Sequence, residues 1–218
     1  MSARYVRTSM VLLAMALPGV ARAQESRLGR VPEAARAPVD SILASARERG
    51  LPLEPLVDRA LEGAAMGAAP GLIVGAVRRL HDELIVVRGA FGVAASTAEL
   101  SAGVSALRAG ASSEDLARLR KLRPGKPLTV AAAVLADLAA AGVPADTAVG
   151  AVMVLARDAD DADYIAFRRN VQRDIEQGAS PAAALAIRVR GALADAEVNS
   201  PSVPGSQSGT GTRPKRKP

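Results

Sequence analysis

Four glycines recur along this chain, and each of the four ends a run of apolar residues at helical spacing. Gly50, Gly110, Gly142 and Gly178 stand at such ends, and a proline or serine follows each of them two residues later. Glycine takes the left-handed conformation that closes a helix, whereas serine and proline favour the first positions of the next helix. The pattern therefore predicts short helices joined by tight turns.

Helical periodicity dominates the segments between these turns. Apolar residues recur every three or four positions, no long stretch alternates as a strand would, and the abundant alanine disfavours strands. Ser96 with Glu99 fits a capping box, and Ser180-Pro181 fits an N-cap followed by the first helical residue. We predict an all-α protein with helices near residues 36–48, 53–66, 70–88, 96–108, 112–122, 127–141, 144–157, 161–177 and 180–195.

The spacing of the turns leaves two helical architectures open. It divides the chain into helical hairpins of roughly 30 to 40 residues, which is typical of solenoid-like arrays. The tetratricopeptide pattern and the ankyrin Thr-Pro-Leu-His pattern are both absent. Because the recurring unit is a cap signal without a packing signature, an array of helical hairpins and an irregular multi-helix bundle are equally compatible with the sequence.

The first 23 residues have the order of a secretory signal peptide. Two arginines precede an apolar run from Met10 to Val20, and the small residues Ala21 and Ala23 indicate cleavage after Ala23. The run is shorter than the roughly 20 residues that cross a bilayer, and no later segment qualifies as a span. We therefore expect an exported mature chain without a transmembrane segment, in the periplasm rather than in the extracellular medium.

The remaining chain divides into a leader at 24–34, a helical domain at 35–198 and a disordered basic tail at 199–218. The formal net charge is +6, from 28 basic and 22 acidic residues. Seven of the basic residues lie in the signal peptide or in the last six positions, which leaves 21 against 22 in the body. The positive charge therefore argues only for contact between the tail and an anionic surface, and not for specific nucleic-acid binding.

Two groups of basic residues are candidate anion-binding or surface-binding sites. The first lies near the end of a predicted helix that Glu114 and Asp115 open, a charge order that the helix dipole favours in any case. The second lies in the tail, where four charges would give weak, salt-sensitive adhesion to an anionic surface. The candidates are Arg118, Arg120, Lys121, Arg123, Lys126, Arg213, Lys215, Arg216 and Lys217.

The densest acidic cluster consists of Asp158, Asp160, Asp161 and Asp163. Its spacing resembles the start of a calcium loop, but Asp163 and Arg169 occupy the positions where that loop needs glycine and glutamate. The acidic first turn of a helix explains the cluster at least as well. With one histidine and no cysteine, we expect no zinc site, and no motif indicates a cofactor.

His81, the only histidine, is followed by Asp82 and Glu83. Side chains one and two positions apart point to different sides of a helix, so we expect ion pairs with Arg78 and Arg79 rather than a catalytic base and its orienting acid. The nucleophile elbow, the Walker loop, the zinc-protease motif and the dinucleotide fingerprint are absent.

Four glycines at Gly63, Gly67, Gly71 and Gly75 repeat every four residues. Pro70 interrupts the run, so we expect it to belong to two helices that pack closely, with a partner-binding ridge as the alternative.

Together, these features favour a non-enzymatic interaction or scaffold protein of the cell envelope, which binds a protein or peptide through its helical body. The first alternative is a protein held to anionic lipid or polymer by its basic tail. The second is an enzyme with an unrecognised site built on carboxylates such as Glu62, Asp82 or Glu83.

Overall fold

The structure is a computed structural model that describes residues 27–199. Within this range the regular structure is entirely helical, as predicted. None of the helices between residues 27 and 199 is both long enough and apolar enough to cross a membrane. The helices are α2 (Glu33–Glu48), α3 (Glu54–Ala65), α4 (Pro70–Phe91), α5 (Thr97–Arg108), α6 (Ser113–Leu122), α7 (Thr129–Ala140), α8 (Ala145–Leu155), α9 (Asp161–Glu176) and α10 (Pro181–Asn199).

The signal peptide expected at 1–23 and residues 200–218 of the expected tail lie outside the described residues, while Asn199, the expected first residue of that tail, ends α10. The described part of the leader is packed against the helical body, because Leu28 and Val31 are buried. Arg27 pairs with Glu54 and Asp58 of α3. This segment therefore covers the end of the array that α2 and α3 form.

Helix boundaries lie at the turns and caps that the sequence predicts. Gly50, Gly110, Gly142 and Gly178 all have a left-handed φ, between 66° and 102°. The capping box at Ser96 is confirmed: the Glu99 amide donates to Ser96 Oγ over 3.2 Å, and the Ser96 amide donates to Glu99 Oε2 over 2.9 Å. α10 begins at Pro181 directly after Ser180, also as predicted.

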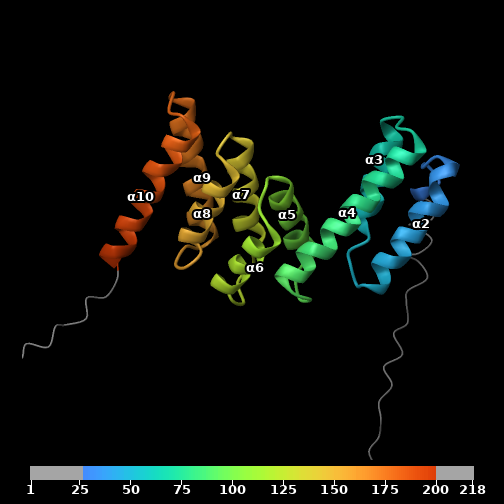
Figure 1. Cartoon of the computed structure of the whole chain (residues 1–218), viewed down its shortest axis with the longest axis horizontal. Coiled ribbons are helices and arrows are strands. Elements are labelled where there is room, and N and C mark those ends of the chain that lie inside the picture. The colour runs from blue at the N-terminus through green and yellow to red at the C-terminus, as the bar shows by residue number, and fades with distance from the viewer. Residues whose placement is uncertain (1–26, 200–218) are drawn as a thin grey trace, which may run out of the picture.

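The helices are arranged as an elongated array in which α2 and α10 occupy opposite ends (Figure 1). Each helix makes its extensive contacts with the next helix or the next but one. The even-numbered helices α2, α4, α6, α8 and α10 follow one another in one layer, while α5, α7 and α9 follow one another in a second layer. This all-helical arrangement agrees with the predicted fold class, which comprises both the array of hairpins and the irregular multi-helix bundle.

A continuous aliphatic core runs between the two layers. Leu56, Leu84, Leu116 and Leu135 are fully buried in it, and Tyr164 is its largest aromatic side chain. The helices approach one another closely where the chain supplies small residues. At Gly63, for example, a Cβ atom would lie 3.0 Å from Ile73 Cγ1 of α4. The glycine run at 63–75 does span two helices, α3 and α4, because α3 ends at Ala65 and α4 begins at Pro70.

Candidate functional site

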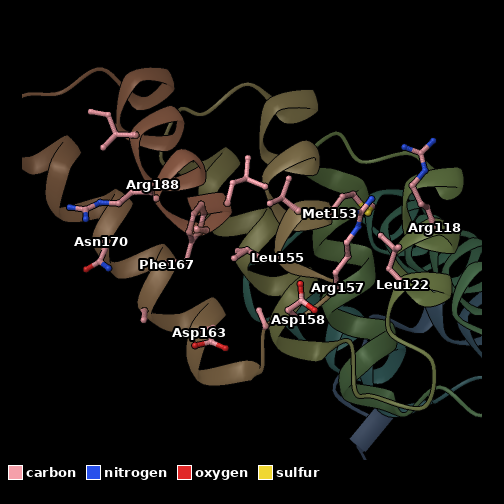
Figure 2. Close-up of a pocket in the computed structure, with 17 residues that line it drawn as sticks. Arg118, Leu122, Met153, Leu155, Arg157, Asp158, Asp163, Phe167, Asn170 and Arg188 are labelled. Atoms are coloured by element: carbon pink, nitrogen blue, oxygen red, sulfur yellow. The ribbon is translucent and has the colours of Figure 1, made fainter. Parts of the chain in front are cut away.

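An open groove of about 1190 Å³ lies near the C-terminal end of the array. Residues of α6, α8, α9 and α10 and of the α8–α9 connection line it. Figure 2 shows Leu155 and Phe167 near the centre, Arg118 and Leu122 on the side of α6, and Arg188 and Asn170 on the opposite side.

The groove arises from uneven packing within the even-numbered layer. α2 packs extensively on α4, and α4 on α6, but α6 and α8 touch only lightly. α8 is supported instead by α7 beneath it and by α10 beside it. A space therefore remains between α6 and α10, with α8 and α9 at its base.

The base of the groove is apolar. Phe167 of α9 is buried, and Met153 and Leu155 of α8 are half-buried. On the α10 wall, Ile187 and Leu193 are 58% and 48% exposed. Isolated exposed apolar residues are common on protein surfaces, but contiguous ones mark binding sites.

Charged side chains stand around this apolar base. Arg188 is neutralised by Asp174, with Nε and Nη2 donating to the two carboxylate oxygens over 2.7 and 2.6 Å. The same hydrogen bond lowers the pKa of Asp174 and raises the pKa of Arg188. Arg118, Arg157 and Asp158, by contrast, form no hydrogen bond or ion pair with a side chain among residues 27–194.

Arg123 joins the end of α6 to the edge of the groove. Its side chain is 2% exposed, Nη1 donates to the Ala159 carbonyl over 2.7 Å, and Nη2 donates to Asp161 Oδ1 over 3.0 Å. The guanidinium also lies 5.0 Å from the centre of the Tyr164 ring. Burial raises the pKa of Tyr164 to about 12, and its hydroxyl donates to the Val152 carbonyl. These contacts hold the α8–α9 connection, which supplies one edge of the groove.

A second buried polar centre links α5, α6 and the start of α7. Glu99 Oε1 accepts from Arg120 Nη2 over 2.7 Å and from the Leu128 amide over 3.0 Å. Burial alone would raise the pKa of Glu99, but hydrogen bonds from the Ser96 and Leu128 amides and from the Ser96 and Arg120 side chains outweigh it and lower the pKa. Arg120 also donates to the Lys126 carbonyl and lies 5.9 Å from the centre of the Phe91 ring.

The structure thus distributes the predicted basic cluster over different environments. Arg118 lines the groove, whereas Arg120 and Arg123 use their charge inside the array. Lys121 and Lys126 are exposed and do not line the groove. The four basic candidates of the tail, 213–217, lie outside the described residues.

The acidic cluster is also divided among different contacts. Asp160 and Asp163 form a capping box at the start of α9, and Asp161 accepts from Arg123. Asp158 alone faces the groove without a partner among the described side chains. No group of three histidine or acidic side chains within residues 27–194 is arranged to hold a metal ion.

The carboxylates considered for catalysis lie in separate side-chain pairs. Glu83 pairs with Arg108 of α5 instead of the expected Arg79, because the α4–α5 contact brings that guanidinium within 2.6 Å. Glu62 pairs with Arg59. His81 is buried, and its Nδ1 lies 2.9 Å from Asp82 Oδ1. The expectation that these adjacent side chains point apart was wrong, because the two side chains lie within hydrogen-bond distance of each other.

The groove has no signature in the sequence, because its apolar residues come from four helices. Phe167 lies at helical spacing from the buried Tyr164 and Val171 in α9, and nothing in the local sequence distinguishes a residue at the base of a groove from one in the core.

Comparison with protein-family models, with curated proteins and with solved structures finds no match to this chain.

Proposed function

We propose that this protein is an exported, non-enzymatic interaction protein of the cell envelope that binds a partner polypeptide in the groove between α6, α8, α9 and α10. The groove itself is the observation that carries the proposal. Its volume of about 1190 Å³ exceeds the roughly 300–1,000 Å³ of most small-molecule sites, and its apolar base is open to solvent.

The residues of the groove support binding rather than catalysis. Its 17 lining residues include no serine, threonine, cysteine, histidine, lysine or tyrosine, so hydroxyl, thiol, imidazole and amine nucleophiles are not among them. Asp163 is hydrogen-bonded within the cap of α9, and Arg188 is paired with Asp174. The side chains that stay available are apolar ones and a few charges at the rim, which is the composition of a recognition surface.

The order of helix contacts supports a second part of the proposal, namely that the body is a helical-repeat solenoid. Such arrays present extended surfaces to other polypeptides because each unit contacts only its neighbours. The signal-peptide pattern at 1–23 supports export, and the periplasm is the compartment that we propose.

Site-specific photocrosslinking in the producing cells tests the proposed function. A benzophenone amino acid replaces Ile187, which lines the groove, or Leu72, which is 68% exposed at the start of α4 and lies outside it. We expect a discrete crosslinked polypeptide from position 187 and none from position 72. The same products from both positions, or none from 187, would contradict the proposal. N-terminal sequencing of the protein from the periplasmic fraction tests export and cleavage after Ala23.

A further inference from the structure

We infer that the occupant of this groove is an amphipathic α-helix that carries an apolar face and, beside it, carboxylate side chains that pair with Arg118 and Arg157. The inference rests on the proposed function and specifies the chemistry of the partner.

The secondary structure around the groove favours a helical occupant. An extended peptide gains most of its affinity by adding a strand to an exposed sheet edge, and residues 27–199 contain no strand to offer one. Proline-rich peptides use grooves lined by several aromatic rings, whereas Phe167 is the one aromatic residue in this lining. An amphipathic helix needs only an apolar trough between two helical walls, which α6 and α10 supply over α8 and α9.

The walls also permit a close approach. Ala166 of α9 and Gly191 and Ala192 of α10 line the groove with little or no side chain. A Cβ atom built on Gly191 would meet nothing within 4 Å. Small residues allow helix axes to come to the 8–10 Å that is usual for packed helices, so the apolar face of an added helix can reach Leu155 and Phe167.

The charges select the polar side of that helix. Arg118 and Arg157 have no partner among the described side chains, while Arg188 and Asp163 are already engaged. A docked helix would remove water from these two guanidinium groups, and an unpaired charge that loses its water is costly. Carboxylates on the occupant remove that cost, since arginine and carboxylate form two parallel hydrogen bonds. Asp158 is the remaining acidic residue of the lining without a partner among the described side chains, so we expect the occupant to carry a basic residue opposite it.

Two synthetic peptides test this inference with the purified full-length protein. Each is a fluorescent 18-residue helix former with leucine on one face, and the flanking positions carry glutamate in the first peptide and lysine in the second. Fluorescence anisotropy measures binding. We expect the glutamate peptide to bind about tenfold more tightly, because its ion pairs with two arginines outweigh the repulsion from Asp158. We also expect this preference to fall as salt is raised.

Charge reversal at the rim gives the decisive comparison. R118E/R157E should weaken the glutamate peptide about tenfold and strengthen the lysine peptide. The matched control R78E/R79E changes the same number of charges at two exposed positions of α4 and should alter neither affinity. A second variant, I187E, replaces an exposed lining residue and should weaken both peptides. Far-UV circular dichroism verifies that each variant keeps its helices.

The outcomes separate the inference from the proposed function. Equal binding of both peptides, no effect of R118E/R157E, or displacement of the peptide by phosphatidylglycerol vesicles would overturn the acidic helix as occupant. In that case a crosslinked partner at position 187 would still support the proposed function. Binding of neither peptide overturns the inference, and a simultaneous lack of crosslinks at position 187 overturns the proposed function as well.

Discussion

Replacing Arg123 by alanine should destabilise the protein far more than removing any exposed arginine. The substitution deletes a side chain that is 2% exposed and leaves the Ala159 carbonyl without its donor. It also removes the cation that lies over the Tyr164 ring. Loss of one partner of a buried ion pair costs about 3–5 kcal/mol. Because the Asp161 side chain is 43% exposed and regains water, we expect the lower end, about 3 kcal/mol.

Urea unfolding followed by circular dichroism measures this difference as a change in the free energy of unfolding. The matched control is Arg168→Ala, which breaks the exposed pair between Arg168 and Asp137 and should cost about 0.2–1 kcal/mol. Arg123→Lys should recover little of the loss, because an ammonium group lacks the planar fork that reaches Ala159 and Asp161 together. If Arg123→Ala cost no more than Arg168→Ala, the argument that Arg123 holds the α8–α9 connection would be refuted.

Three further substitutions probe other contacts. Glu99→Gln should lower the free energy of unfolding by about 2 kcal/mol at pH 7, since it weakens charge-assisted hydrogen bonds. Because folding lowers the pKa of Glu99, its contribution is present above the ordinary value of 4.5 and is lost as the pH falls further, so urea unfolding of the two proteins should converge in acid. Gly103→Ala should cost about 1–3 kcal/mol in thermal unfolding, because the added Cβ atom would lie 2.9 Å from Phe91 Cε2 and still closer to Val87. Ser112→Ala should cost about 1 kcal/mol in the same assay through the lost cap of α6; an unchanged melting temperature would contradict it.

Local chemistry explains why the helices could be predicted from the sequence. A left-handed glycine such as Gly110 and a capping serine such as Ser96 act on residues of the same turn, so their effect is visible in a short window. The capping boxes at Ser112 and Asp160 were missed because aspartate, at residues 115 and 163, takes the place usually held by glutamate. Even there, the predicted starts at residues 112 and 161 lie within one residue of the observed starts at Ser113 and Asp161.

The candidate site could not be predicted in the same way, because its contacts join distant parts of the chain. Arg123 and Asp161 are 38 residues apart, and the groove extends from Arg118 of α6 to Leu193 of α10. Periodicity assigns a residue to the buried face of a helix, but it does not tell whether another helix covers that face. Phe167 and Leu155 have ordinary core spacing, and only the light contact between α6 and α8 leaves them beside a groove.

The groove and the buried position of Arg123 are both related to the light contact between α6 and α8. Where neighbouring helices of a layer pack closely, as α2 packs on α4, aliphatic side chains hold them together. α6 and α8 touch only lightly, and Arg123, directly after α6, links this helix to the α8–α9 segment through Ala159 and Asp161. The hydrogen bonds of Arg123 connect the two segments at one end of the space between α6 and α8 and leave the rest of that space open. Close apolar packing along both helices would fill it. The near-neutral charge of the body therefore includes arginines in two different environments. Arg120 and Arg123 form ion pairs inside the array, whereas Arg118 and Arg157 line the groove without a partner among the described side chains.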